Sequence, residues 1–312
     1  MKPQISVILC VNTEMTRLPK LWKILEEQSK KVNFELLVSD SGSKDDSVRF
    51  LKQKERTEKH FRVKLFQIKP QNFGHGKARN FLAKFAQGEF LIFFSADVFP
   101  VTKNWFLNLI KPFADQKVQA VFGRQVPYKN ASVFDQYFYS LAYPRKDKII
   151  TLNKEEGFSV DTVYFSMVNA AMRKSALQKN QFVENKDASV DQWWAKKILE
   201  NGGEIFYTAK AAVFHSHNYS YSALFKRQFS SGHSLIGFPK ASFLKSVFDV
   251  LRYLRGEFLF ILRKGSVKEL LQMPLYEAVR FSGFFLGSQA NNLPKFFVNK
   301  FYILKSPRFE KK

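Results

Sequence analysis

The clearest indication of the fold class is the sequence Gly88-Glu89-Phe90-Leu91-Ile92-Phe93-Phe94-Ser95-Ala96-Asp97-Val98-Phe99-Pro100. Five consecutive apolar residues, 90–94, end abruptly at a small polar residue that is followed two positions later by a carboxylate. A run this short is typical of a buried strand, and open α/β sheets bind their ligands at the carboxyl ends of strands. Asp97 is therefore a candidate metal ligand.

Three earlier runs have the same character. Residues 5–11, 34–40 and 63–68 are apolar, β-branched or aromatic, and helical stretches separate them. Strands that alternate with helices predict an α/β fold with a mostly parallel sheet flanked by helices. We predict one such domain over residues 1–240 and a tail, 241–312, in which the alternation stops and the chain becomes helical, aromatic and basic.

The 312-residue chain has a single cysteine, Cys10, so no intramolecular disulfide is possible, which agrees with a reducing cytoplasm. No basic stretch followed by an apolar core opens the chain. No apolar run approaches the roughly 18 to 20 residues that a bilayer span needs. We therefore expect a cytoplasmic protein that is neither secreted nor integral to a membrane.

The net charge of +23, from 50 Lys and Arg against 27 Asp and Glu, indicates an anionic partner, because an unneutralised field of that size opposes the compact state. Nucleic acid would suit the charge, but the sequence has no basic recognition helix, zinc ligand set or aromatic RNA-binding motif to organise it. An anionic membrane surface suits the chain better because of its tail.

The tail contains two segments, 243–255 and 267–287, with apolar residues on one face at helical spacing. In the first segment, Lys245, Arg252 and Arg255 lie nearer the other face. Such helices bind the membrane interface with the apolar face down and the cations toward anionic headgroups. Helices that pack on the α/β domain and are basic outside have the same periodicity, so the sequence leaves both arrangements open.

Six short motifs occur in a specific order and spacing: Ser6-Val7-Ile8-Leu9, Ser39-Asp40-Ser41-Gly42-Ser43-Lys44-Asp45, His75-Gly76-Lys77-Ala78-Arg79-Asn80, Ser95-Ala96-Asp97, Gly123-Arg124-Gln125 and His215-Ser216-His217-Asn218-Tyr219-Ser220. With them the chain resembles the inverting family 2 glycosyltransferases, which have the nucleotide-diphospho-sugar fold called GT-A. It is most similar to their rhamnosyltransferase-like subgroup, and the resemblance continues into the tail through Met273-Pro274-Leu275-Tyr276-Glu277-Ala278. It implies a nucleotide-sugar half over residues 1–125 and an acceptor half over residues 126–240.

The nucleotide half offers a carboxylate at a strand end. Asp40 can accept hydrogen bonds from a nucleotide base or ribose, and the resemblance implies that role for it. The nearby Ser43 and Asp45 are instead expected to cap the next helix, 47–54. Arg79 follows two glycines at a helix start, where amides and cations can approach phosphate oxygens together. The other predicted nucleotide contacts are Val11, Thr13, Glu14, Ser95 and Ala96.

The predicted metal site combines a carboxylate with an imidazole. Mg²⁺ and Mn²⁺ take oxygen ligands, and Mn²⁺ also accepts an imidazole. Asp97 ends the Ser-or-Thr, variable, Asp pattern of the subgroup, and His215 matches the family's metal-binding histidine, so the resemblance implies a divalent metal, Mn²⁺ or Mg²⁺, held by both. His217 is the alternative ligand. On residue type alone, a strand-end histidine is more often structural.

The predicted catalytic base is Asp191. It matches the family residue that takes the proton of the acceptor hydroxyl. The segment 183–195 opens a helix with Asp191 in its first turn, where the macrodipole would favour the ionised carboxylate. Asp187, four residues earlier, is the alternative base or a helix cap.

The resemblance also implies a sugar and acceptor pocket lined by Arg124, Gln125, Asn169, Trp193 and His217. From the residues alone, segment 165–170 is predicted to be a half-buried strand. Trp193 competes with Trp194 as a platform for a sugar ring, although a tryptophan on an amphipathic helix is usually buried. Residues 226–232 are predicted as a mobile flap whose Arg227 reaches the diphosphate, or as a solvated basic turn.

These features predict a metal-dependent glycosyltransferase, peripheral on the inner face of the plasma membrane, that transfers a sugar with inversion onto a lipid-linked cell-surface glycan. The predicted donor is dTDP-rhamnose, with a UDP- or GDP-sugar as the alternative. A nucleotidyltransferase would need a Gly-rich, Arg- and Lys-bearing loop after the first strand, and residues 11–14 have none. The non-enzymatic alternative is a lipid- or nucleic-acid-binding module on a decayed scaffold, against which Asp191 and His215 both argue.

Overall fold

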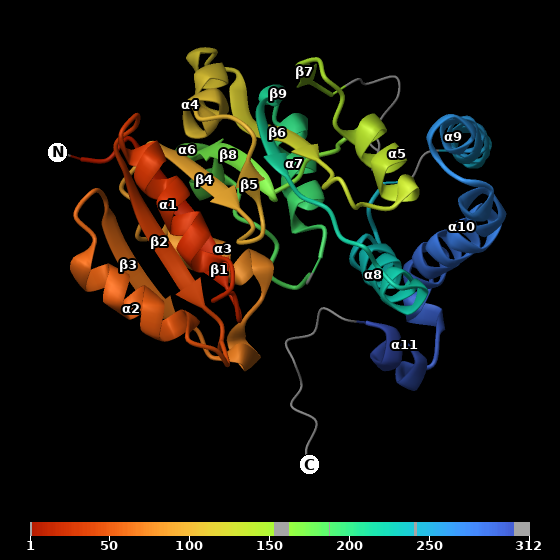
Figure 1. Ribbon diagram of the computed structural model, residues 1–312, viewed down its shortest axis with the longest axis horizontal. Coiled ribbons are helices and arrows are strands. Elements are labelled where there is room, and N and C mark those ends of the chain that lie inside the picture. Colours follow the sequence, from red (N-terminus) through yellow and green to blue (C-terminus); the bar gives the residue numbers. More distant parts are fainter. Residues whose placement is uncertain (1, 153–161, 187, 240–241, 303–312) are drawn as a thin grey trace.

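The computed structural model describes residues 2–152, 162–186, 188–239 and 242–302. Within these residues the chain forms a nine-stranded sheet in the order β3-β2-β1-β4-β8-β6-β9-β5, with β7 paired to β9 (Figure 1). The strands are β1 (Ile5–Val11), β2 (Phe34–Asp40), β3 (Arg62–Gln67), β4 (Phe90–Phe94), β5 (Phe99–Pro100), β6 (Val118–Val126), β7 (Lys148–Ile150), β8 (Asn169–Arg173) and β9 (Glu204–Phe214). The predicted α/β fold is confirmed, and β1 and β2 have the predicted bounds.

The sheet is parallel in its first half and mixed in its second. β1 pairs in parallel with β2 and β4, and β2 pairs in parallel with β3. β8 lies antiparallel to both β4 and β6, while β9 is parallel to β6. The strand predicted over 165–170 begins only at Asn169, which pairs with Phe94. That register is set by the partner strand and is not visible in the segment's own sequence.

Helices cover both faces of the sheet, because alternate residues of a strand point to opposite sides. Val7 and Leu9 belong to the hydrophobic core formed with α1, α2 and α4, whereas Ile8 belongs to the core formed with α3, α6 and α7. The bounds are α1 (Leu18–Ser29), α2 (Ser47–Thr57), α3 (His75–Ala83), α4 (Trp105–Ile110), α6 (Lys174–Lys179) and α7 (Val190–Glu200). The two cores hold the strand ends at one edge of the sheet in fixed positions.

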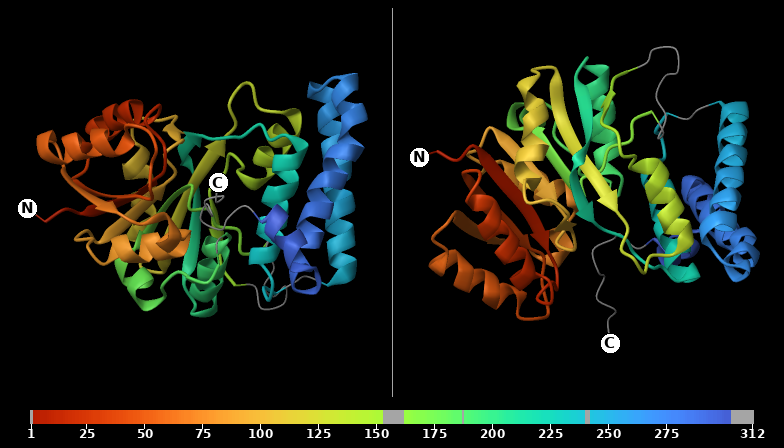
Figure 2. Two further views of the ribbon diagram at one scale, coloured as in Figure 1. Left: turned by 90° about the horizontal axis from the view of Figure 1, so that it is seen from below. Right: turned by 45° about the horizontal axis from the view of Figure 1, so that its top comes forward.

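A third layer of helices lies beside the sheet (Figures 1 and 2). It contains α5 (Val133–Ala142), α8 (Tyr221–Ser234), α9 (Phe243–Lys264), α10 (Val267–Ser288) and α11 (Lys295–Phe301). α10 docks on α8 through glycines: a Cβ on Gly232 would overlap the carbonyl oxygen of Phe284, and a Cβ on Gly287 would overlap that of Phe229. The tail is therefore packed against α8, while the predicted boundary at residues 240–241 lies outside the described residues.

α9 presents its apolar stripe to the outside. Phe248, Leu251 and Leu262 are 64, 60 and 57% exposed, whereas Glu257 on the inner face is 0% exposed. Both helices pack on the α/β domain, α10 through α8 and α9 through α5, and both leave apolar side chains exposed. None of the helices in the described ranges has both the length and the apolar character that crossing a bilayer requires.

Candidate functional site

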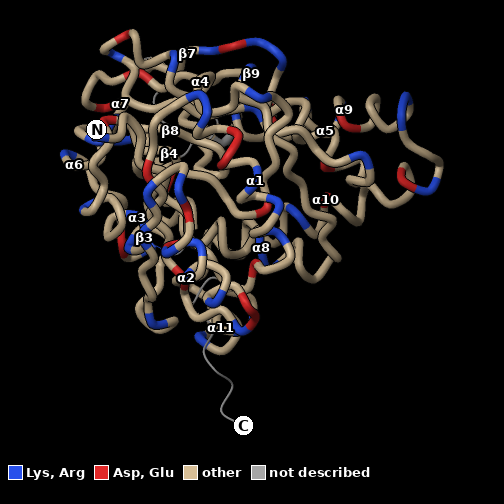
Figure 3. The backbone as a smooth tube through the Cα atoms, turned by 60° about the vertical axis from the view of Figure 1, so that its left-hand side comes forward, with Lys and Arg blue, Asp and Glu red and all other residues tan. Residues whose placement is uncertain are grey.

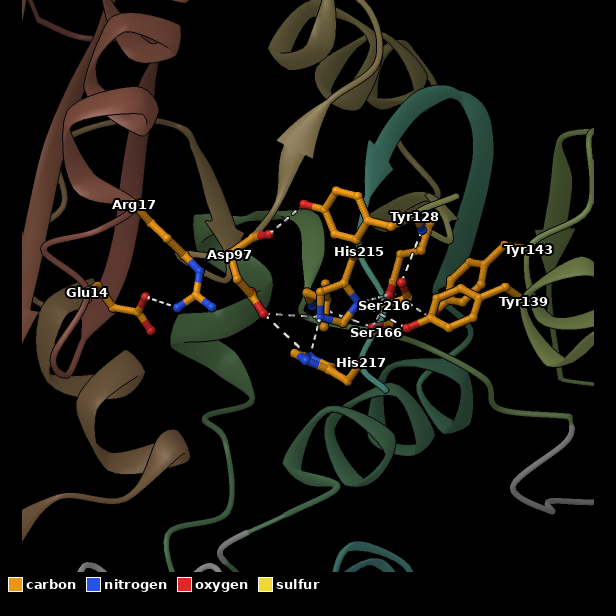
Figure 4. A network of polar contacts seen from close by, with 12 residues as sticks. Glu14, Arg17, Asp97, Tyr128, Tyr139, Tyr143, Ser166, His215, Ser216 and His217 are labelled. Atoms are coloured by element: carbon orange, nitrogen blue, oxygen red, sulfur yellow. Dashed lines mark hydrogen bonds and ion pairs between the residues drawn. The ribbon is translucent and has the colours of Figure 1, made fainter. Parts of the chain in front are cut away.

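Three potential metal ligands converge at the carboxyl ends of β4 and β9 (Figure 4). Asp97 follows β4, and His215 and His217 follow β9. The Oδ2 atom of Asp97 lies 3.7 Å from Nε2 of His215 and 3.4 Å from Nε2 of His217. The two Nε2 atoms lie 3.1 Å apart. His217 is predicted only as an alternative to His215, but both histidines turn the same ring nitrogen toward Asp97.

The sheet and its hydrogen bonds orient His215. Its backbone N–H donates to the carbonyl oxygen of Val126 at 2.9 Å, which continues the β6–β9 pairing. The amide nitrogen of Gln125 donates to Tyr143 and Ser166, so its oxygen faces Nδ1 of His215 at 2.8 Å. With Nδ1 acting as the donor, Nε2 carries the lone pair that faces Asp97. Burial lowers the pKa of His215 to about 4, so the ring is neutral at neutral pH.

The donor set fits a divalent cation of borderline character. One carboxylate oxygen and two imidazole nitrogens, all within 4.8 Å of one another, can be brought to a common ion. Nitrogen ligands suit Mn²⁺ better than Mg²⁺, which prefers oxygen ligands and water. Arg17 lies beside Asp97 and is held by Glu14 at 2.6 Å (Figure 4). A cation and a guanidinium at this edge would together attract an anionic ligand.

Asp191 lies in the first turn of α7, as predicted. Its carboxylate accepts hydrogen bonds from the backbone N–H groups of Met167 at 3.3 Å and Gln192 at 3.1 Å. The macrodipole was expected to favour the ionised form, but burial raises the pKa of Asp191, and the positive charge of Arg79 offsets part of that rise. Desolvation outweighs the helix dipole here, which makes the carboxylate a stronger base than an exposed one.

A cavity of about 420 Å³ connects Asp191 with His215 and His217. This volume lies in the range of about 300–1,000 Å³ that is usual for ligand pockets. Gln125, predicted for the sugar and acceptor pocket, and Arg227, predicted to reach the diphosphate, also line it. Its remaining wall is rich in aromatic side chains, with six tyrosines from the α/β domain and the tail: Tyr139, Tyr143, Tyr164, Tyr219, Tyr253 and Tyr276.

Three residues predicted for the pocket do not line this cavity. Arg124 donates from Nε to the carbonyl oxygen of Tyr143 at 3.3 Å. Asn169 is 0% exposed and donates to the carbonyl oxygen of Ala211 at 2.7 Å, which ties β8 to β9. Trp193 donates to the carbonyl oxygen of Ser234 at 3.0 Å. In each of these three residues, a backbone carbonyl group of another segment accepts a hydrogen bond from a side-chain nitrogen.

The predicted flap is a helix. Residues 226–232 lie within α8, whose Gly232 is in contact with α10, so neither a mobile flap nor a turn describes them. The fixed position follows from the docking of α10, a contact between segments about 50 positions apart that local sequence does not reveal. Arg227 nevertheless faces the cavity, with its guanidinium 5.4 Å from the ring centre of Tyr219.

The predicted nucleotide contacts surround the ends of β1 and β2. Asp40 is 1% exposed, and its carboxylate accepts hydrogen bonds from the backbone N–H groups of Gly42 and Ser43 at 2.9 and 3.2 Å. Val11 is buried at the end of β1, and Ser95, Ala96 and Arg79 lie beside the neighbouring strand and on α3. The protein thus already uses the carboxylate of Asp40 to shape its own turn.

Two non-glycine residues with left-handed backbone adjoin predicted functional positions. Thr13, with φ 56°, precedes Glu14, and Ser189, with φ 52°, lies two residues before Asp191. Such strain concentrates at ligand sites, where surrounding structure maintains it. Asp187, the alternative base, lies outside the described residues.

Several residues at the site escaped the sequence analysis. Arg17 could have been found from its three-residue spacing to Glu14 just before α1, a spacing at which opposite charges often pair. Tyr128 donates to the carbonyl oxygen of Asp97 at 3.4 Å. Tyr139, whose hydroxyl lies 3.1 Å from Nδ1 of His215, comes from α5. From the hydrophobic periodicity of the sequence, Tyr128 and Tyr139 would be predicted to be ordinary core residues.

Comparisons with known proteins agree with this architecture. The family described as Glycosyl transferase family 2 matches residues 6–180. The chain is 29% identical to the O-antigen chain rhamnosyltransferase RfbN of Salmonella typhimurium, over 87% of this chain and 85% of that protein. It is 28% identical to the O-antigen chain rhamnosyltransferase WbaN of Salmonella anatum, with the same coverage.

Solved structures share the fold at low sequence identity. The mannosyltransferase PcManGT of Pyrobaculum calidifontis, in complex with GDP-Man and Mn²⁺, is 17% identical, with a TM-score of 0.62 over 94% of this chain and 87% of that one. TarS 1–349 of S. aureus, in complex with UDP-GlcNAc, is 16% identical, with a TM-score of 0.53 over 94% of this chain and 92% of that one.

Proposed function

Since the chain belongs to glycosyl transferase family 2, we propose that it transfers a sugar, with inversion, from a nucleotide-sugar donor to a saccharide carried on a lipid diphosphate. One observation carries the proposal: Asp191 shares a cavity with two imidazoles that face the carboxylate of Asp97. A metal ligand set at a sheet edge, next to a buried carboxylate, suits group transfer from a diphosphate.

The proposed donor is dTDP-rhamnose. The similarity to two O-antigen chain rhamnosyltransferases, each over 87% of this chain, supports that choice. Structural neighbours bind GDP-Man and UDP-GlcNAc, so the alternatives are a GDP- or UDP-sugar. The O-antigen relatives likewise support a growing cell-surface glycan as the acceptor.

Asp191 is proposed to act as the general base. Its carboxylate would take the proton of the acceptor hydroxyl while that oxygen forms a bond to the anomeric carbon. The bond from the anomeric carbon to the diphosphate breaks on the opposite face, and the nucleoside diphosphate departs. The pKa of Asp191, raised by burial, increases its affinity for that proton.

Asp97, His215 and His217 are proposed to hold the divalent cation. When bound, the cation would stabilise the negative charge that develops on the departing diphosphate. The hydrogen bond between Gln125 and His215 keeps one ring nitrogen available as a ligand. Arg17, beside Asp97, would add a second positive charge next to the diphosphate.

The tail is proposed to bind the inner face of the plasma membrane, so that the protein is a peripheral cytoplasmic enzyme. The apolar stripe of α9 is exposed, and Lys245, Arg252 and Arg255 are exposed beside it. Basic positions also occur over the α/β domain (Figure 3), which suits an anionic surface better than a single neutral partner. In this proposal residues 1–240 form the catalytic domain and residues 241–312 the membrane-binding extension.

A thermal-shift panel tests the proposal. Wild type, Asp97→Ala and an exposed control, Asp46→Ala, are heated with nucleoside diphosphates and nucleotide sugars, with and without Mn²⁺ or Mg²⁺. A ligand that binds only the native state raises the melting temperature. We expect a metal-dependent rise with one thymidine, uridine or guanosine species that is lost in Asp97→Ala alone. No rise with any nucleotide would reject catalysis in favour of a binding module.

A further inference from the structure

The tail forms part of the cavity that contains the base. Tyr253 of α9 and Tyr276, Arg280 and Phe284 of α10 line the same cavity as Asp191. A membrane anchor alone would not need side chains there. The inner faces of these helices therefore have a role distinct from that of their outer faces.

Close packing fixes this wall relative to the base. Tyr276 stacks on Phe134 of α5, with ring centres 4.1 Å apart and planes inclined by 12°. The hydroxyl of Tyr137 donates to the carbonyl oxygen of Tyr253 at 3.1 Å. Together with the glycine contacts between α8 and α10, these contacts hold the wall rigid, which lowers the entropy cost of binding a ligand.

The chemistry of the wall favours a neutral, hydroxylated ligand. Arg280 is already paired with Glu277, at 2.8 Å from Nε and 2.6 Å from Nη2 to the same carboxylate oxygen. Its charge is compensated, so this end of the cavity does not select a phosphate. Phe284 and Tyr276 offer aromatic surface, while Gln228 and Ser231 of α8 add polar groups to the cavity wall. Apolar rings surrounded by a few polar groups match the C–H faces and hydroxyl rims of a sugar.

We propose that Tyr253, Tyr276, Arg280 and Phe284 form a binding subsite for a sugar residue of the acceptor, so that the tail completes the acceptor site. The inference rests on the proposed function, because it assigns the acceptor to the end of the cavity away from the metal ligands. It also explains why α10 has aromatic side chains that line the cavity as well as apolar side chains that are exposed to solvent. Leu275 and Phe285 are exposed beside Tyr276 and Phe284, so the lipid and sugar parts of one acceptor could contact adjacent positions.

Binding of simple glycosides tests the subsite without a full acceptor. Methyl α-glycosides of rhamnose, galactose and mannose are presented at millimolar concentration, and saturation-transfer NMR reports which of them contact the protein. We expect at least one signal with wild type, and about threefold to tenfold weaker binding in Tyr276→Ala, because the stacking contact is lost. Phe284→Ala should act in the same direction.

Neighbouring residues provide matched controls. Leu275→Ala and Phe285→Ala shorten exposed side chains of the same helix and should leave the glycoside signal unchanged. Tyr276→Phe keeps the stack on Phe134, so a weaker signal in this variant, at an unchanged melting temperature, would report the lost hydroxyl and not misfolding. Absence of any glycoside signal in wild type, or equal signals in wild type, Tyr276→Ala and Phe284→Ala, would overturn the subsite.

The same samples separate this inference from the proposed function. The nucleotide-dependent thermal shift of Tyr276→Ala should equal that of wild type, because the proposed metal and nucleotide contacts lie at the sheet edge and not in the tail. A normal shift with glycoside binding that ignores Tyr276 and Phe284 would reject the subsite and leave the transferase proposal intact. A missing shift in wild type would reject the transferase proposal itself.

Discussion

The two ends of the cavity are built in different ways. At the sheet end, Asp97 and His215 follow strands whose hydrogen bonds fix each polar atom. At the helical end, α8 and α10 are held by the fit of glycines against backbone carbonyl groups. Loss of a single polar atom should therefore be severe at the sheet end, whereas added volume should be the more damaging change at the helical end.

The largest effect is expected at the base. Asp191→Asn should lower the turnover rate by about 10²–10⁴-fold, the usual contribution of a general base, with donor binding retained. Because the base acts in its ionised form, the wild-type rate should rise with pH through the pKa of Asp191, which burial raises above that of an ordinary aspartate. The variant should lack that rise. Release of nucleoside diphosphate, measured from pH 4 to 9, reports both effects.

Asp187→Asn is the control for this prediction. The sequence offered Asp187 as the alternative base, and it lies four positions before Asp191. If Asp191 is the base, Asp187→Asn should keep the wild-type pH profile. If instead the rise of the rate with pH is lost in Asp187→Asn and kept in Asp191→Asn, Asp187 is the base and Asp191 is not.

The next effect concerns the helical end. A side chain at Gly287 would overlap the carbonyl oxygen of Phe229, so Gly287→Val should cost about 1–3 kcal/mol, as overpacking usually does. Hydrogen exchange should accelerate in α9 and α10, while nucleotide binding at the sheet edge persists. Ser282→Val adds a similar group at an exposed position of the same helix and should change little. Equal exchange in both variants would mean that the glycine contacts do not hold the tail.

The same contrast explains what the sequence could predict. β1 and β2 were found with their observed bounds because short apolar runs with polar ends are local signals. The convergence of His215 on Asp97 was anticipated from the resemblance to family 2 glycosyltransferases, because residue type alone favours a structural role for a histidine at a strand end. The buried side of α9 could not be predicted, because its inner face contains Glu257. Only the packing of α10 against α9 brings Glu277 and Arg280 close to that carboxyl group. The hydrogen bond of Asn169 could not be predicted for a related reason, since its partner Ala211 is 42 positions away.

A smaller effect is expected at the outer face of α9. Leu251→Ser with Leu262→Ser should weaken co-sedimentation with anionic vesicles by about tenfold or more, because each buried leucine contributes roughly 1.5–3 kcal/mol. Activity toward a water-soluble acceptor should persist, since neither residue lines the cavity. Leu107→Ser changes an exposed leucine of α4 and serves as the control. Unchanged vesicle binding in the double variant would remove α9 from the membrane interface.

The last effect concerns the stability of the helical end and not the chemistry at the sheet end. Glu257 is buried opposite Glu277, with Arg280 and Tyr253 beside it, and burial together with the charge of Glu277 raises the pKa of Glu257 to about 8. The native state therefore keeps a proton that the unfolded chain releases near pH 4.5. Between these values the free energy of unfolding should fall as pH rises.

Glu257→Gln keeps the shape of the side chain and removes this titration. Its melting temperature at pH 8.5 should therefore exceed that of wild type, by about 2–4 °C for each kcal/mol recovered, and the difference between pH 5.5 and pH 8.5 should shrink. Glu27→Gln, which changes an exposed glutamate, should retain the wild-type dependence. The metal-dependent nucleotide shift should be the same in both variants, because Glu257 acts through packing of the tail and not through the sheet-edge ligands. If the melting temperature of Glu257→Gln still depended on pH as in wild type, another group would be responsible for the titration. A protonated Glu257 would then not be part of the packing that holds the tail.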